Sequence, residues 1–165
     1  MPPLARPATA QRGRRRPAQA TYALSTAYTV SDGVIVTRAD DGSIRTLADL
    51  RGKTTAQSAT SNWAGIAKDA GAKVEAVEGF TQAVTLVKQG RVDATVNDNL
   101  AVLQYTKTTG DRSVKVAAQT GNTSEQVFAM RQDDTALRDA VDDALATLRQ
   151  DGTLTRISQK YFDTD

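Results

Sequence analysis

The sequence predicts an α/β fold built on a parallel sheet. Between residues 46 and 117, short apolar stretches of strand length alternate with segments of helical periodicity. Several helical segments end at a glycine, among them Gly71, Gly90 and Gly110, and glycine is the residue that most readily takes the left-handed conformation at a helix C-terminus. Short connections between alternating strands and helices are typical of right-handed crossovers in a parallel sheet.

Local signals place each element along the chain. Strands are expected at residues 34–36, 53–57, 74–77, 92–96, 114–117 and 126–130, which are apolar or alternating. Helices are expected at residues 47–50, 61–70, 80–87, 100–108, 134–149 and 154–162, which have helical periodicity. Thr46 and Asp49 form a capping-box pattern before the first helical turn, and the hydroxyl of Ser61 is suited to cap the second helix. The small and polar residues at 120–123, which include Gly121, predict a linker.

Composition restricts the chemistry of this chain. Its 165 residues contain neither cysteine nor histidine, which excludes thiol nucleophiles, histidine bases and Cys/His zinc sites. The net charge is +2, but the first 19 residues carry five arginines and no acid, so removing those five charges leaves −3 for residues 20–165. The body of the chain therefore offers no basis for nucleic-acid binding. No metal or cofactor is expected, and no segment has the apolar length of a membrane span.

The first 19 residues differ sharply from the rest. They hold all four prolines, lack hydrophobic periodicity and are expected to form a disordered tail rich in proline and arginine. The arginine cluster is not followed by the apolar run of ~7–15 residues that a secretory signal needs, so we expect no signal peptide in this sequence.

Polar side chains follow two of the predicted strands. The first loop contains a run of small polar residues: Ser58, Thr60, Ser61 and Asn62. Hydroxyls and unpaired backbone N–H groups at the start of a helix can receive an anion. Asp98 follows a later strand and can receive a cation. Because ligands of parallel α/β sheets bind outside the carboxyl ends of the strands, both loops are expected to serve one pocket for a zwitterion, such as a free amino acid.

Each of these residues also has a purely structural interpretation. Thr60 and Ser61 can act only as helix N-caps, which contribute about 0.5–2 kcal/mol to a helix. Asp98 can be a solvated loop acid or the cap of the next helix. Trp63, the sole tryptophan, is expected to be a packed anchor beneath the loop rather than a stacking platform. Residue types and spacing alone leave these alternatives open.

Several stretches resemble the motifs of one known family. Ser25-Thr26-Ala27-Tyr28 is similar to an S-T-P-Y motif with alanine in place of proline, and residues 44–53 are similar to I-x-x-L-x-D-L-x-G-K. Residues 90–94 resemble a G-x-x-D-A motif, and residues 149–162 resemble a C-terminal pair of helices. In this order and spacing, residues 22–162 resemble the solute-binding proteins of amino-acid ABC transporters, bacterial extracellular solute-binding protein family 3.

The resemblance implies a type II periplasmic-binding-protein-like α/β fold, in which a ligand is held between two lobes by hinge closure. It assigns residues 38–118 to a complete second lobe with a parallel sheet, and residues 20–37 and 119–165 to an incomplete first lobe. The loop from Ser58 to Asn62 is then expected to meet the α-carboxylate of an amino acid, and Asp98 its α-ammonium. Residues 57–63, 78–80 and 96–98 are most similar to the cystine-binding branch.

The resemblance also implies the partners. A binding protein of this family is not an enzyme; it takes up a free polar amino acid and passes it to the permease of an ABC transporter. It lies in the periplasm or at the cell surface, and it meets the membrane only through the permease or through a lipid anchor, which we do not find in this sequence.

One departure from the family lowers the expected affinity. Family members carry a further first-lobe segment before the S-T-P-Y motif, including an arginine that clamps the carboxylate, and here the Pro/Arg tail stands in its place. We therefore expect a truncated chain that binds weakly. Two alternatives remain: an enzyme on the same scaffold, similar to cyclohexadienyl dehydratase, which the absence of histidine disfavours, and the ligand-sensing domain of a membrane receptor.

Overall fold

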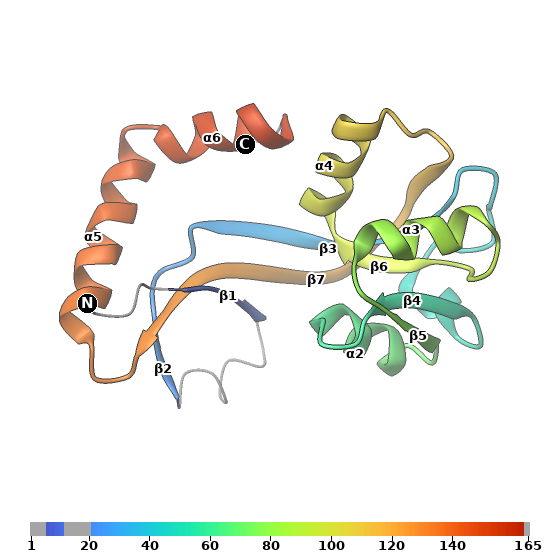
Figure 1. Ribbon diagram of the computed structural model, residues 1–165, viewed down its shortest axis with the longest axis horizontal. Helices are drawn as coiled ribbons and strands as arrows, with labels where there is room; N and C mark the ends of the chain where they lie inside the picture. Colours follow the sequence, from blue (N-terminus) through green and yellow to red (C-terminus); the bar gives the residue numbers. More distant parts are fainter. Residues whose placement is uncertain (1–5, 12–20, 164–165) are drawn as a thin grey trace. The chain divides into compact units, whose positions relative to one another are not determined.

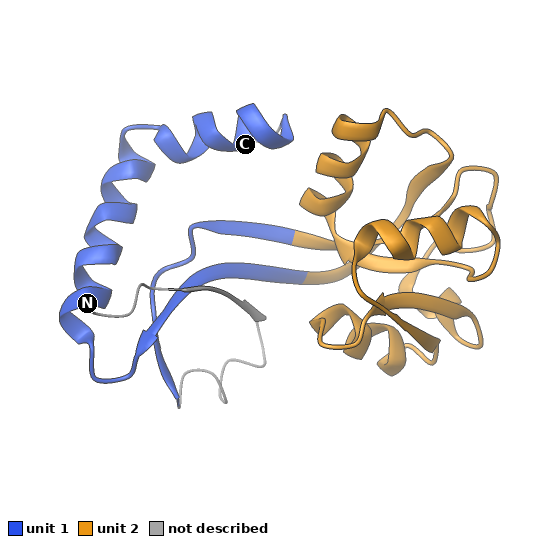
Figure 2. Cartoon of the chain, in the orientation of Figure 1, with its two compact units in different colours: residues 1–31, 123–165 blue, residues 32–122 orange. Residues whose placement is uncertain are grey.

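The chain forms two compact units (Figure 2). The computed structural model describes residues 6–11, by their backbone only, and residues 21–163. Residues 1–31 and 123–165 make up unit 1, and residues 32–122 make up unit 2. Unit 2 contains all the residues that we expect to bind a ligand.

Two long strands run through both units (Figure 1). β3 (Thr29–Arg38) and β7 (Val114–Arg131) are neighbours in a five-stranded sheet of order β1-β7-β3-β6, and β2 also pairs with β7. The lobe boundaries expected after residues 37 and 118 fall inside these strands. The linker expected at residues 120–123 is wrong, because β7 continues through it. Gly121, which predicted a turn, has a φ of 73° but lies within the strand.

The strands of unit 2 belong to two sheets: β4 (Thr54–Ser58) and β5 (Lys73–Val77) form a two-stranded sheet, whereas β3, β6 (Thr95–Asp98) and β7 belong to the five-stranded one. β4 and β5 pair in parallel, as the alternation of strands and helices predicts. A parallel bridge between Thr55 and Ala94 continues this arrangement toward β6. However, β6 pairs antiparallel with β3. The parallel pairing predicted for the strands of this unit is therefore correct for β4 and β5 but not for β6 with β3.

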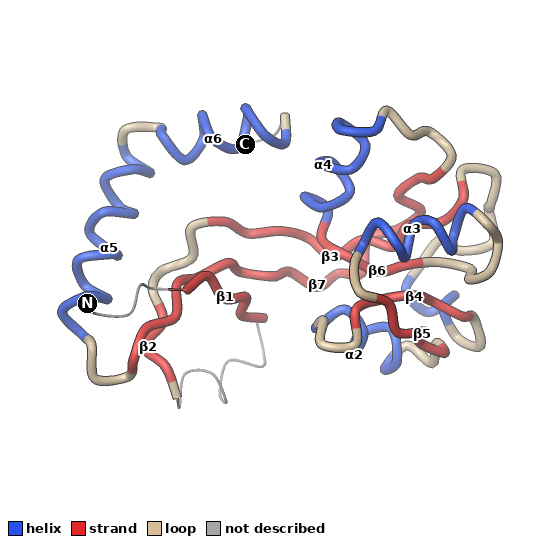
Figure 3. The backbone as a smooth tube through the Cα atoms, in the orientation of Figure 1, coloured by secondary structure: helices blue, strands red, loops and turns tan. Residues whose placement is uncertain are grey.

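Helices of unit 2 lie on both sides of β3 (Figure 3). The helices of unit 2 are the 3-10 turn η1 (Leu47–Leu50), α2 (Asn62–Asp69), α3 (Phe80–Lys88) and α4 (Asn99–Thr109). Ile35 of β3 belongs to the core cluster that contains α2 residues, whereas its neighbours Val34 and Val36 belong to the cluster that contains Val102 of α4. Adjacent residues of a strand point to opposite faces, so α2 and α4 lie on opposite sides of β3.

The expected capping box at η1 is confirmed. Asp49 Oδ2 accepts hydrogen bonds from Thr46 N at 2.9 Å and from Thr46 Oγ1 at 3.0 Å. It also accepts from Arg45 N at 2.9 Å. One carboxylate thereby satisfies two backbone N–H groups ahead of the turn, which fixes the point where the chain enters it.

Unit 1 contains β2 (Tyr22–Leu24), α5 (Thr135–Gln150) and α6 (Thr153–Phe162). β2 pairs antiparallel with β7, and so does β1 (Arg6–Gln11). The prediction of disorder over residues 1–19 is therefore wrong for β1, and the rest of that segment lies outside the described residues. Composition does not reveal this strand, because its pairing with β7 is formed by backbone N–H and C=O groups. Every segment carries such groups, including segments with few apolar residues. No helix among the described residues combines the length and apolar character needed to cross a membrane.

Asp111 joins α3, α4 and the start of β7 within unit 2. Its carboxylate accepts hydrogen bonds from Lys88 Nζ at 2.6 Å, from Tyr105 Oη at 2.7 Å and from Ser113 Oγ at 2.6 Å. The Lys88 ammonium, followed by the Ser113 and Tyr105 hydroxyls, holds the pKa of Asp111 well below its usual value of 3.8. The carboxylate is therefore bound in its charged form.

We expect Asp111→Ala to lower the melting temperature at neutral pH. Because the folded-state pKa is depressed, the stabilisation is present above the pKa of the unfolded chain, near 3.8, and is lost as pH falls through the folded-state value. Thermal unfolding followed by circular dichroism at decreasing pH should show the two melting temperatures converging below about pH 4. The control is Asp40→Ala, because the Asp40 side chain is 76% exposed. A gap between Asp111→Ala and the unmodified chain that is independent of pH would contradict the prediction.

Candidate functional site

The first part of the candidate site is the turn between β4 and α2. Ser58 ends β4, and Ser61 is the N-cap of α2, where its Oγ accepts a hydrogen bond from Trp63 N at 3.1 Å. The Ser61 backbone is extended, with φ −72° and ψ 138°, as an N-cap requires. Ser58 and Thr60 share a hydrogen bond between their hydroxyl oxygens, at 3.4 Å. The turn thus combines hydroxyls with the backbone N–H groups at the start of a helix, a combination suited to an anion.

Asp98 forms the second part. It is the last residue of β6, which begins and ends two or three residues later than the strand expected at 92–96. Its Oδ2 accepts a hydrogen bond from Trp63 Nε1 at 3.1 Å. Asp98 occupies the N-cap position of α4, but its side chain makes no capping hydrogen bond to that helix. The carboxylate is therefore turned to a neighbouring element instead of its own helix.

Trp63 connects the two parts. Its side chain is 2% exposed and belongs to a core cluster with Ile35 and Val96, which confirms the expectation of a packed anchor. The indole N–H nevertheless reaches Asp98, and the backbone N–H of the same residue reaches Ser61. A buried indole N–H usually finds a partner, but the sequence did not reveal that this partner is a candidate ligand-binding acid.

The remaining predicted residues are placed as follows. Asn62 is the first residue of α2, and its buried Nδ2 has no hydrogen-bond partner within the part of the chain that the structure describes. Thr60 is exposed. The structure thus links Ser61 to Asp98 through Trp63 and pairs Ser58 with Thr60, while the amide of Asn62 stays unpaired among the described residues.

A small recess lies beside this turn. Its volume is about 40 Å³, and Ser58 and Ser61 line it together with Gln57 of β4, Thr95 of β6 and Phe80 of α3. Gln57 and Thr95 are only 3% and 1% exposed. Their Nε2 and Oγ1 atoms have no hydrogen-bond partner among the residues described. Since buried polar groups normally have a partner, the recess can accept a polar atom next to the candidate turn.

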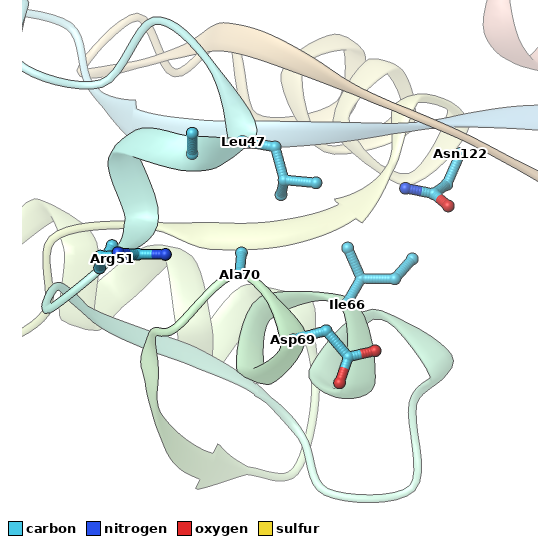
Figure 4. A pocket seen from close by; sticks show the side chains of 7 residues that line it. Leu47, Arg51, Ile66, Asp69, Ala70 and Asn122 are labelled. Atoms are coloured by element: carbon cyan, nitrogen blue, oxygen red, sulfur yellow. The ribbon is translucent and has the colours of Figure 1, made fainter.

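A second pocket in unit 2 has a different character (Figure 4). Its volume is about 750 Å³, and it is lined by Leu47, Ala48, Arg51, Ile66, Asp69, Ala70 and Asn122. Arg51 and Asn122 lie at opposite sides, with Leu47 and Ile66 between them. None of the predicted ligand-binding residues lines this pocket, and its mainly apolar middle lacks the hydroxyls and helix-start N–H groups of the Ser61 turn.

Gly33 belongs to the site although residue types did not single it out. It lies in β3 directly opposite Asp98. A Cβ at this position would overlap Trp63 Cζ3 and Thr120 Oγ1 and would lie 2.7 Å from Trp63 Cη2. The available signal was a glycine at the start of an apolar strand, which often marks a close approach by another group.

Known proteins resemble this chain over most of its length. The model of the bacterial extracellular solute-binding proteins, family 3, matches residues 8–164, so the match begins inside the segment that we expected to be a tail. The chain is 48% identical over 144 residues to the L-cystine-binding protein TcyA of Bacillus subtilis, covering 87% of this chain and 54% of that protein. It is 46% identical over 144 residues to a probable amino-acid ABC transporter-binding protein of Haemophilus influenzae, covering 87% and 56%. The chain thus spans about half the length of these curated relatives.

Solved structures resemble it as well. The L-cystine solute receptor of Neisseria gonorrhoeae, in an unliganded open conformation, is 36% identical with a TM-score of 0.69, over 89% of this chain and 62% of that one. An ancestral arginine-binding protein bound to arginine is 32% identical with a TM-score of 0.74, over 86% and 64%. These likenesses confirm the expected α/β fold.

Proposed function

The chain belongs to family 3 of the bacterial extracellular solute-binding proteins, and on that premise we propose that it binds a free polar amino acid for an ABC importer. Cystine is the first candidate ligand, because TcyA and the Neisseria gonorrhoeae receptor are both named for L-cystine. The name of the Haemophilus influenzae relative supports an ABC transporter as the partner, and we propose that the permease of such a transporter receives the ligand. The extracellular character of the family supports a periplasmic or cell-surface location.

The link from Ser61 through Trp63 to Asp98 carries the proposal. An α-amino acid bears a carboxylate and an ammonium group on one carbon, so its site needs donors and an acid close together. The donors that we assign to the carboxylate are the hydroxyls, amide and N–H groups of Ser58, Thr60, Ser61 and Asn62. Asp98, held to the same turn by the indole of Trp63, is the acid that we assign to the ammonium group.

The proposal contains no catalytic step. The groups around the turn are hydroxyls, amides and a carboxylate, and the sequence has no histidine or cysteine to act as a base or nucleophile near neutral pH. Binding followed by release to a permease needs only the reversible contacts that these groups provide.

Calorimetric titration of the 165-residue chain with L-cystine, L-glutamine and L-arginine tests the proposal. We expect binding with dissociation constants well above the micromolar range. A charge-assisted hydrogen bond contributes ~1.5–3 kcal/mol, and ~1.4 kcal/mol is tenfold in affinity. No arginine of this sequence lies in a motif that matches the family's carboxylate clamp, and we propose that binding lacks that contact.

A control ligand and two defined outcomes complete the titration. N-acetyl-L-glutamine, which has no free ammonium group, is the control for L-glutamine and should bind less tightly. Dissociation constants of a micromolar or below would contradict the expected weakness. If none of the three amino acids binds at millimolar concentration, the proposed function is wrong for this chain.

A further inference from the structure

Trp63 donates two hydrogen bonds to residues that are 37 positions apart in the sequence, Ser61 and Asp98. Its backbone N–H bonds to Ser61 Oγ, and its indole N–H bonds to Asp98 Oδ2, each at 3.1 Å. One residue thereby contacts both the donor-rich turn and the acid. Because Ser61 Oγ accepts a hydrogen bond from Trp63, the proton of this hydroxyl can be donated to an acceptor such as a carboxylate.

The indole is fixed in place. Trp63 is 2% exposed and packs in a cluster with Ile35, Ala67 and Val96. On the side of β3, Gly33 gives it space that a Cβ would fill. A ring held on several sides has little rotamer freedom, so the atom that contacts Asp98 keeps a defined position.

We propose that Trp63 is a positioning residue, which orients the Asp98 carboxylate toward the α-ammonium group of the ligand and sets its spacing from the Ser61 hydroxyl. The part that concerns the ligand rests on the proposed function. A carboxylate on an unconstrained side chain must lose its freedom when the ligand binds, whereas one already held by an indole N–H has lost it beforehand. Such preorganisation increases affinity without adding a contact to the ligand.

The first test needs no ligand. Trp63 is the only tryptophan, so the ¹⁵N-labelled chain gives one indole N–H resonance in NMR. We expect Asp98→Ala to shift this resonance and to speed its exchange with solvent. Glu75→Ala, which removes an exposed carboxylate on β5, is the matched control and should leave it unchanged. An indole resonance that is the same in Asp98→Ala and in the unmodified chain would overturn the proposal.

The second test is a double-mutant cycle with L-glutamine as the probe. Trp63→Phe keeps an aromatic ring but removes the indole N–H, and it should weaken binding by about tenfold. In an Asp98→Ala background the same change should cost less than about twofold, because there is no carboxylate left to orient. Equal costs in both backgrounds indicate a packing role only and overturn the proposal.

The two tests separate the possible failures. Circular dichroism and a melting curve identify a Trp63→Phe variant that does not fold, and the Asp98→Ala resonance, measured with Trp63 intact, then decides the matter. If the unmodified chain binds no amino acid, the proposed function fails, while the indole resonance still confirms or overturns the positioning of Asp98.

Discussion

Asp98→Ala is expected to lower the affinity for L-glutamine roughly 10- to 100-fold, a loss that a titration followed by NMR chemical shifts at high ligand concentration can still measure. The carboxylate is the group that we assign to the α-ammonium, and a hydrogen bond between charged groups contributes about 1.5–3 kcal/mol. The side chain makes no capping bond to α4, so its removal should leave that helix intact. Titrations of the two proteins, followed by calorimetry or by NMR chemical shifts, provide the measurement.

Asp98→Asn removes the negative charge of this side chain but keeps its size and a hydrogen-bond acceptor. An asparagine oxygen can still accept the hydrogen bond from Trp63 Nε1, so the indole resonance should remain close to that of the unmodified chain while the affinity falls. N-acetyl-L-glutamine, which offers no ammonium group, should bind equally to the unmodified chain and to both variants. Unchanged L-glutamine affinity in Asp98→Ala would rule out the proposed role of this acid.

The helices and the parallel pair of strands could be predicted because their signals are local. The capping pattern of Thr46 and Asp49 and the hydroxyl of Ser61 mark helix starts through side chains within a few residues of the bonds that they make. The apolar run at residues 34–36 likewise lies inside β3. Such short-range rules depend on backbone groups that must be satisfied wherever the helix lies.

The errors concern long-range pairing. Gly121 looks like part of a turn when only its neighbours are considered, yet β7, which pairs with strands far away in the sequence, continues through it. β1 was missed for the same reason, since its ladder with β7 is formed by backbone groups that composition does not report. The antiparallel pairing of β6 with β3 also depends on residues about sixty positions apart.

In the candidate site, too, the local features were predictable and the long-range contact was not. Ser61 was predictable as a donor at a helix start, and Asp98 as an acid at a strand end. Trp63 was predictable as an anchor because it is large and apolar, but its bond to Asp98 joins residues 35 positions apart. Only the fold brings that pair together.

Gly33→Ala is expected to displace the indole of Trp63 and thereby to disturb its contact with Asp98. The new Cβ would overlap Trp63 Cζ3 and Thr120 Oγ1, so the indole has to move or β3 has to shift away from it. Adding a methyl group to a packed core typically costs about 1–3 kcal/mol of folding free energy. Denaturant unfolding followed by the fluorescence of the single tryptophan measures this loss, and the indole resonance reports any displacement from Asp98.

Gly42→Ala is the matched control for this change. Gly42 has open space around its Cβ position and no positive φ, so the same substitution there meets neither a neighbour nor a strained backbone. Its stability should stay within about 0.5 kcal/mol of the unmodified chain. If Gly33→Ala is equally harmless and leaves the indole resonance in place, the close packing of Trp63 on β3 does not hold Asp98 in position. A loss of stability together with a shifted indole resonance ties the packing of β3 to the geometry of the acid.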